Sequence, residues 1–302
     1  MPGRRITVVE MPTNLGLARM PHAVEPGVRK LPDWLKTWGL HARTGAEKTL
    51  RIKAPAYRSD VDPVTGVRNA DAIIEYAIAQ SAVLENELDN NTCLLVLGGD
   101  CSILIGCALA LKKKGTYGLF YLDGHTDFIE PGQSETKAAA GMDLAIVCGL
   151  GHPKLTNIQD NGPYLDQRFV YCVGNREYDE DYEAPVKTSS VSYFPLHQLR
   201  EIGTRNVALD FLDMVDSNNL DGFFIHLDAD VLDDTVMAAV DSRQADGLSY
   251  AELKDMLIPL LSSRKAVGME ITILDPDLDA DGKYTKVFVN NILSILKDAG
   301  LI

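Results

Sequence analysis

The feature of the sequence that most constrains the fold is a set of three short apolar runs, each ending in side chains that bind metal ions. The runs and the residues that follow them are 94–98 with Cys101; 118–122 with Asp123, His125 and Asp127; and 222–227 with Asp228 and Asp230. Short, continuous apolar runs are typical of strands buried in a parallel sheet, whose carboxyl ends meet at one edge. Ligands are expected at that edge, so the sequence predicts a metal site there.

The second run carries the densest cluster of ligands. If it continues as a strand, its side chains alternate between the two faces of the sheet, so Asp123, His125 and Asp127 share one face. Taken alone, this spacing fits an ordinary polar turn equally well. The repetition of the pattern at Asp228 and Asp230 favours a divalent cation, since carboxylates and imidazoles suit hard or borderline ions.

Helical and strand patterns alternate along the rest of the chain. Strands are predicted at residues 6–10, 50–53, 144–148, 169–173 and 266–274, and helices at 35–39, 69–88, 102–113, 204–215, 249–261 and 286–297. Ser249 and Glu252 form a capping-box pattern, and the acidic residues 177–183 are interpreted as a solvated loop. We expect residues 1–302 to form a single domain, a three-layer α/β/α sandwich around a mostly parallel sheet.

Charge and composition narrow the class of partners. The formal net charge of -14 argues against a nucleic acid or an anionic membrane surface, because both need a basic face on the protein. No apolar run approaches the roughly 18 residues of a membrane span, and the apolar stretch within residues 1–10 is too short for a signal peptide. We therefore expect a cytoplasmic protein.

The five cysteines include no C-x-x-C pair, so no disulfide framework is implied. Cys101 stands near the amino end of the helix predicted at 102–113. The partial positive charge of that helix end would lower the pKa of the thiol and favour a thiolate that binds a metal or attacks an electrophile. The alternative is an inert buried thiol.

Four motifs, in their order along the chain, resemble those of the ureohydrolase family, which includes arginases and agmatinases. They are Gly-Gly-Asp-Cys-Ser at 98–102, Asp-Gly-His-Thr-Asp at 123–127, Asp-Ala-Asp-Val-Leu-Asp at 228–233 and Leu-Asp-Pro at 274–276. The resemblance spans nearly the whole chain and implies a hydrolase of non-peptide C–N bonds that uses two divalent ions, usually manganese. A hydroxide bridging the ions would attack the carbon of a linear guanidine, amidine or amide, since two such ions lower the pKa of bound water towards about 7.

The resemblance also assigns the metal ligands. Cys101, Asp123, Asp127 and Asp228 would hold one ion, and Asp123, His125, Asp228 and Asp230 would hold the other. Cys101 stands where most of the family has a histidine, and its softer thiolate makes zinc or iron possible in place of manganese. A homo-oligomer is a further implication of the resemblance.

Three other positions depart from the arginases. Ala140 stands where arginases keep a proton-shuttling histidine, and Ile129 stands where they bind the substrate carboxylate through an asparagine. Ile273 takes the position of the glutamate that stabilises the guanidinium, and Glu270 becomes a catalytic candidate if the alignment is shifted. We therefore expect an enzyme that is not an ordinary arginase.

His226 and Asp179 complete the candidates. His226 precedes Asp228 by two residues and shares its face, so it is interpreted as a donor to a carboxylate or a general acid, with a core histidine as the alternative. Asp179 is predicted to bind a cationic end of the substrate, with a solvated loop as the alternative. The alternative to an enzyme is a non-catalytic protein of this fold that binds a ligand or partner. The enzyme is favoured because converging carboxylates repel one another unless a cation is bound.

Overall fold

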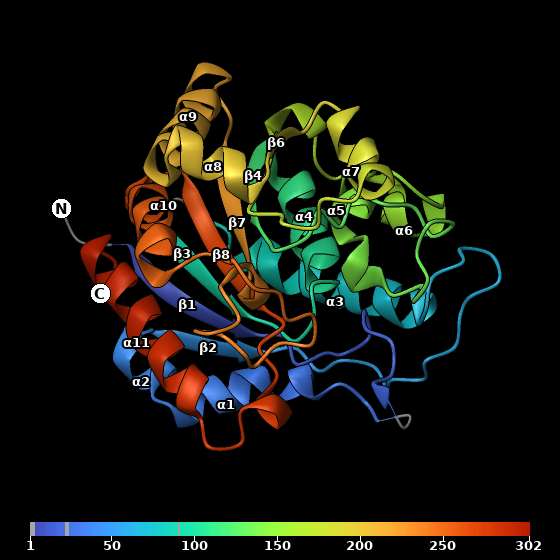
Figure 1. Cartoon of the computed structure of the whole chain (residues 1–302), viewed down its shortest axis with the longest axis horizontal. Coiled ribbons are helices and arrows are strands. Elements are labelled where there is room, and N and C mark those ends of the chain that lie inside the picture. The colour runs from blue at the N-terminus through green and yellow to red at the C-terminus, as the bar shows by residue number, and fades with distance from the viewer. Residues whose placement is uncertain (1–3, 22–23, 90) are drawn as a thin grey trace.

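Eight strands form one sheet in which every neighbouring pair runs parallel (Figure 1). The computed structural model describes residues 4–21, 24–89 and 91–302, and within them the strand order is β2-β1-β3-β8-β7-β4-β5-β6. The strands are β1 Arg5–Glu10, β2 Lys48–Arg51, β3 Thr92–Leu97, β4 Tyr117–Leu122, β5 Val170–Val173, β6 Ser192–Phe194, β7 Gly222–Asp228 and β8 Ala266–Thr272. The predicted parallel sheet is confirmed.

Helices cover both faces of this sheet and bury two separate hydrophobic cores, so the predicted three-layer sandwich is confirmed. On one face lie α1 Leu31–Thr37, α2 Leu40–Thr44, α8 Leu196–Ile202, α9 Thr204–Ser217, α10 Tyr250–Ser262 and α11 Lys283–Asp298. On the other lie α3 Ala70–Glu87, α4 Ile103–Lys114, α5 Asp143–Val147, α6 Pro153–Thr156 and α7 Glu180–Lys187. In the described part of the chain, none of these helices has both the length and the apolar character needed to cross a membrane.

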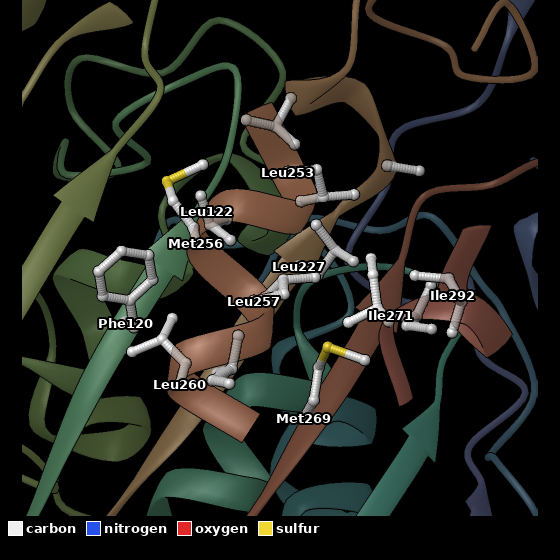
Figure 2. Close-up of a cluster of buried hydrophobic side chains, with 14 of the residues drawn as sticks. Phe120, Leu122, Leu227, Leu253, Met256, Leu257, Leu260, Met269, Ile271 and Ile292 are labelled. Atoms are coloured by element: carbon white, nitrogen blue, oxygen red, sulfur yellow. The ribbon is translucent and has the colours of Figure 1, made fainter. Parts of the chain in front are cut away.

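The strands divide their side chains between the two cores with a period of two. In β4, Phe120 and Leu122 face the core under α9, α10 and α11, whereas Leu119 and Tyr121 face the core under α3 and α4. Figure 2 shows the first core, where Leu257 and other apolar residues of α10 pack over β4, β7 and β8. The central strands are therefore held from both sides, which fixes the positions of their carboxyl ends.

Two of the predictions about secondary structure are wrong. Residues 144–148 were expected as a strand, but 144–147 lie in helix α5 and Cys148 follows its end. A short apolar run cannot distinguish a buried helix from a buried strand. The acidic residues 177–183 are only partly a loop, since α7 begins at Glu180 and its first turn is acidic, as helix N-termini favour. The capping box of Ser249 and Glu252 at the start of α10 is confirmed.

Truncation of Leu257 tests how much the packing of α10 against the sheet contributes to stability. Leu257 is fully buried, so Leu257→Ala should lower the free energy of unfolding by about 2–5 kcal/mol through lost burial and the cavity left behind. Leu209→Ala in α9 is the matched control, because Leu209 is 40% exposed and should change stability by less than about 0.5 kcal/mol. Urea unfolding followed by circular dichroism measures both; equal effects would contradict this packing.

Candidate metal centre

The turns after three strands bring the predicted ligands together at the carboxyl edge of the sheet. Cys101 follows β3, Asp123 and His125 follow β4, Asp228 ends β7, and Asp230 lies in the 3-10 turn Ala229–Val231 that follows. The described residues include two groups of candidate ligands, and within each group all donor atoms lie within 4.8 Å of one another. The inner group is Cys101, Asp123, His226 and Asp228, and the outer group is Asp123, His125 and Asp230.

Glycines allow the turns to approach one another this closely. A Cβ atom on Gly99 would lie 1.7 Å from the carbonyl oxygen of Thr13. A Cβ atom on Gly124 would lie 2.6 Å from the guanidinium of Arg176 and 2.9 Å from Asp230 Oδ1. All three distances are below van der Waals contact, so a larger residue would push the ligand-bearing turns apart.

The outer group is held by backbone amides and by a histidine. His125 Nδ1 lies 3.1 Å from Asp230 Oδ2 and 3.4 Å from Asp123 Oδ1. The amide of His125 donates to Asp123 Oδ1 at 2.7 Å, and the amide of Gly124 donates to Asp230 Oδ1 at 3.1 Å. Arg176 donates to the carbonyl oxygen of Asp230 at 2.6 Å. These bonds fix the carboxylates in converging orientations.

The inner group lies deeper and includes the histidine of β7. The Cys101 thiol donates to Asp228 Oδ2 at 2.8 Å. His226 Nδ1 lies 2.6 Å from Glu270 Oε1, and His226 Nε2 lies 3.8 Å from Asp123 Oδ2. His226 and Glu270 are fully buried. Neither His226 Nε2 nor Asp123 Oδ2 has a hydrogen-bond partner among the described residues.

Asp127 belongs to neither group, and strand alternation does not place it. β4 ends at Leu122, so residues 123–127 form a turn in which Asp127 adopts a left-handed φ of 43°. The Tyr121 hydroxyl lies 2.9 Å from Asp127 Oδ2 and 2.9 Å from Asp143 Oδ1. The expectation that Asp123, His125 and Asp127 share one strand face is therefore wrong. Asp127 still lines the cavity described below, and its role as a ligand stays a prediction.

Burial and crowding of negative charge shift the pKa values of the inner group. Burial, and then the charge of Asp228, raise the pKa of the Cys101 thiol well above its ordinary value. The expected lowering by the helix end is therefore wrong, because lost hydration and nearby carboxylates outweigh the helix dipole. Burial also raises the pKa of Asp228, and the charges of Asp230 and Asp123 add to this effect. A bound cation would favour the charged form of both groups.

In the outer group, the pairing of His125 with Asp230 outweighs the effect of burial on both pKa values. Burial alone would lower the pKa of His125, but Asp230 and Asp123 outweigh it and raise that pKa well above its ordinary value. Burial alone would raise the pKa of Asp230, but His125 outweighs it and lowers that pKa. A divalent ion at this position would replace the imidazolium charge, since a metal binds neutral imidazole.

A cavity of about 270 Å³ opens above both groups. Five of the six predicted ligands line it: Cys101, His125, Asp127, Asp228 and Asp230. Its wall also carries three acidic residues that sequence analysis did not single out, Glu135, Glu177 and Asp241. Burial, and then the charge of Asp230, raise the pKa of Asp241 to about 6. No lysine or arginine lines the cavity among the described residues, so it suits a small cationic ligand.

The three positions that depart from arginases also line this cavity, as Ile129, Ala140 and Ile273. Ile273 follows the end of β8 with a left-handed φ of 68°. The places that hold polar groups in arginases are therefore apolar surface here. Glu135 and Asp241 lie in loops outside any periodic pattern, so the sequence offered no signal that would have selected them, whereas Glu177 belongs to the acidic run 177–183.

The structure separates the remaining candidates from the cavity. His226 and Glu270 lie beneath its floor and are not among the described residues that line it. Asp179 caps α7 by accepting a hydrogen bond from the amide of Tyr182 at 3.0 Å, and it is exposed. Glu177 and Tyr182 are the residues near it that line the cavity. Substrate binding by Asp179 stays a prediction.

Comparisons with known proteins identify the family and the fold of the chain. A model of the arginase family matches residues 20–296. The arginase of Bacillus subtilis (strain 168) is 26% identical over 297 residues, which cover 97% of this chain and 98% of the relative. A crystal structure of Bacillus subtilis arginase has a TM-score of 0.82 at 26% identity and covers 97% of this chain and 98% of its own. A crystal structure of formimidoylglutamase from Bacillus subtilis subsp. subtilis str. 168 has a TM-score of 0.71 at 21% identity. It covers 98% of this chain and 88% of its own, which is a similarity of fold.

Metal binding should stabilise the protein, because the carboxylates of the two groups repel one another without a cation. Manganese or zinc at a hundredfold excess over the dissociation constant should contribute about 2.7 kcal/mol per ion. The melting temperature of chelator-treated protein should then rise by about 5 °C or more. Differential scanning calorimetry measures this shift.

Asp123 is the residue whose removal should abolish the response, because it belongs to both groups. Asp123→Asn should melt at the same temperature with and without metal. Asp255→Asn, on the exposed side of α10, should keep the full shift. A melting temperature that ignores metal in the unmodified protein would rule out the metal centre.

Proposed function

Because the chain belongs to the arginase family, whose members are binuclear metal-dependent hydrolases, we propose that it hydrolyses a C–N bond in a linear amidine, guanidine or amide other than L-arginine. One observation carries the proposal: Cys101 and Asp228 of the inner group and His125 and Asp230 of the outer group line a cavity of about 270 Å³. A volume of this size suits a small molecule.

The residues present fit two divalent ions. Cys101, Asp123, Asp127 and Asp228 would hold one ion, and Asp123, His125, Asp228 and Asp230 would hold the other. Manganese is the ion that the family resemblance implies, and the thiol of Cys101 makes zinc or iron possible. When bound, the ions supply a nucleophile by lowering the pKa of water. The unpartnered Asp123 Oδ2, buried between the two groups, supports this fit.

The charge of the cavity wall supports a cationic substrate. Glu135, Glu177 and Asp241 would attract a guanidinium or amidinium and keep it over the floor. The carboxylate of L-arginine would meet these acids without a basic partner among the described lining residues, and Ile129 offers it no hydrogen bond. A cationic compound without a carboxylate is therefore the favoured substrate.

The remaining lining residues would orient the substrate and exclude water. Ile129, Ala140 and Ile273 present apolar surface that suits a methylene chain, while Tyr182 closes the wall near Thr126, whose amide donates to the Tyr182 hydroxyl at 2.9 Å. A cytoplasmic location and a homo-oligomeric assembly stay predictions.

The substrate proposal is tested by a panel of guanidino, N-hydroxyguanidino, formimino and amide compounds, each with and without a carboxylate, assayed for urea or ammonia. With manganese or zinc bound, cationic compounds without a carboxylate should be the best substrates, and L-arginine should be slow or inactive. Rapid turnover of L-arginine would contradict the proposal. Inactivity across the panel at full metal loading would favour the non-catalytic alternative.

Asp241 provides a variant test of the same proposal. Asp241→Asn removes one wall charge and should lower kcat/KM for a cationic substrate about tenfold or more, equivalent to about 1.4 kcal/mol. A neutral amide should be affected much less. Asp234→Asn is the control, because Asp234 pairs with Arg243 outside the cavity lining. Equal losses for cationic and neutral substrates would exclude a role of Asp241 in recognising charge.

Cys101→His should raise the affinity for manganese, because imidazole suits this ion better than thiolate does. Titration of manganese followed by electron paramagnetic resonance measures the free ion. Cys93→Ala, which alters another buried thiol in β3, should leave the affinity unchanged. Fast labelling of Cys101 by iodoacetamide in metal-loaded protein would instead identify it as a free nucleophile.

A further inference from the structure

We propose that His226 is a metal ligand, and that it forms a deep four-donor zinc site with Cys101, Asp123 and Asp228. The inference rests on the proposed function, since it assigns the inner of the two ions. It differs from the set carried over by resemblance, because His226 takes the place given there to Asp127.

The four donors have the proximity and the burial of a metal site. All of their ligand atoms lie within 4.8 Å of one another, and each residue is at most 3% exposed. Bonds of about 2.0–2.3 Å to a tetrahedral zinc ion imply donor separations of roughly 3.3–3.8 Å. The distance of 3.8 Å between His226 Nε2 and Asp123 Oδ2 falls at the edge of this range. Around an ion, the donors that lie up to 4.8 Å apart would move closer, and the 2.8 Å between Cys101 Sγ and Asp228 Oδ2 would lengthen.

Two unpartnered atoms point to an ion between them. His226 Nε2 and Asp123 Oδ2 are both buried and have no hydrogen-bond partner among the described residues. A buried polar atom without a partner costs about 1–3 kcal/mol, so two that face each other are rarely left without a ligand. A core histidine with all its hydrogen bonds made would use both ring nitrogens, and His226 uses only Nδ1.

Glu270 and Tyr121 prepare the ring of His226 for this role. His226 Nδ1 lies 2.6 Å from Glu270 Oε1, and this contact fixes the ring so that Nε2 faces the other three donors. Tyr121 stacks on the ring at 4.3 Å with an interplanar angle of 7°. The three residues are direct neighbours across β4, β7 and β8. Glu270 is thus a positioning residue that orients the ring of His226 for metal binding.

Asp127 is not part of this group of donors. Its Oδ2 lies 2.9 Å from the Tyr121 hydroxyl, and the adjacent backbone amide of Phe128 lies 3.5 Å from Thr126 Oγ1. A set of one sulfur, one nitrogen and two oxygen donors suits the tetrahedral coordination of zinc better than the all-oxygen surroundings that manganese prefers. The inner site should therefore select zinc, while the outer group remains open to the cavity.

X-ray absorption of the full chain with one equivalent of zinc tests the assignment without relying on turnover. We expect one sulfur near about 2.3 Å together with the scattering of one imidazole. The imidazole signal should persist in His125→Asn and vanish in His226→Asn. Cobalt substitution should give the intense visible bands of a tetrahedral thiolate site in the unmodified protein and in His125→Asn.

Zinc competition titrations give the size of the effect. Glu270→Gln should weaken the tighter site about 10- to 100-fold while keeping the imidazole signal, and His226→Asn should weaken it further. His152→Asn is the control, because His152 is exposed and an asparagine can also cap α6. If His226→Asn does not fold, the spectra of the unmodified protein and His125→Asn still decide the question.

The inference is overturned if the tighter zinc site lacks imidazole scattering, or if that scattering disappears in His125→Asn. If a panel compound is hydrolysed but the tighter zinc site shows no imidazole scattering, the assignment of His226 is rejected and the proposed function stands. Zinc bound through His226 without hydrolysis of any compound would reject the proposed function alone.

Discussion

The mutual repulsion of four buried carboxylates is the constraint on which the rest of the structure depends. Asp123, Asp127, Asp228 and Asp230 are each at most 7% exposed and lie at the same edge of the sheet. Moving a carboxylate out of water costs several kcal/mol unless a counter-charge or hydrogen bonds compensate. Backbone amides, His125 and Arg176 supply part of this compensation. A pair of divalent ions would supply the rest, so the fold and the chemistry share one electrostatic requirement.

A polar row crosses the sheet directly beneath this edge. Tyr121, His226 and Glu270 stand side by side on β4, β7 and β8, on the face that otherwise packs against α3 and α4. Such residues are costly in an apolar layer unless each is partnered. The row is stabilised by the bond between His226 and Glu270 and by the stacking of Tyr121, and the proposed inner ion would complete it. Through His226, this row connects the interior of the sheet with the inner group of donors.

Much of the fold could be predicted because the central strands are apolar on both faces. The runs that form β3, β4 and β7 were predicted as strands, and the candidate ligands that follow them stay predictions. The run that became α5 was misassigned, since five apolar residues carry no usable period. Asp127 was misplaced because the alternation of a strand was extended past Leu122, where the strand ends. Asp241 could not be predicted, because only the folding of its loop brings it to the cavity. The pairing of His226 with Glu270 required the register of β7 against β8, which the sequence does not specify.

The central claim is that the carboxyl edge of this sheet is a binuclear metal centre with Asp123 shared between two ions. Crystals grown with manganese or zinc, with diffraction recorded on both sides of the metal absorption edge, test it most directly. The account predicts two anomalous peaks on opposite sides of the Asp123 carboxylate, one within bonding distance of Cys101 and Asp228 and the other within bonding distance of His125 and Asp230. A map without anomalous density at this edge, from crystals soaked at saturating metal, would contradict it.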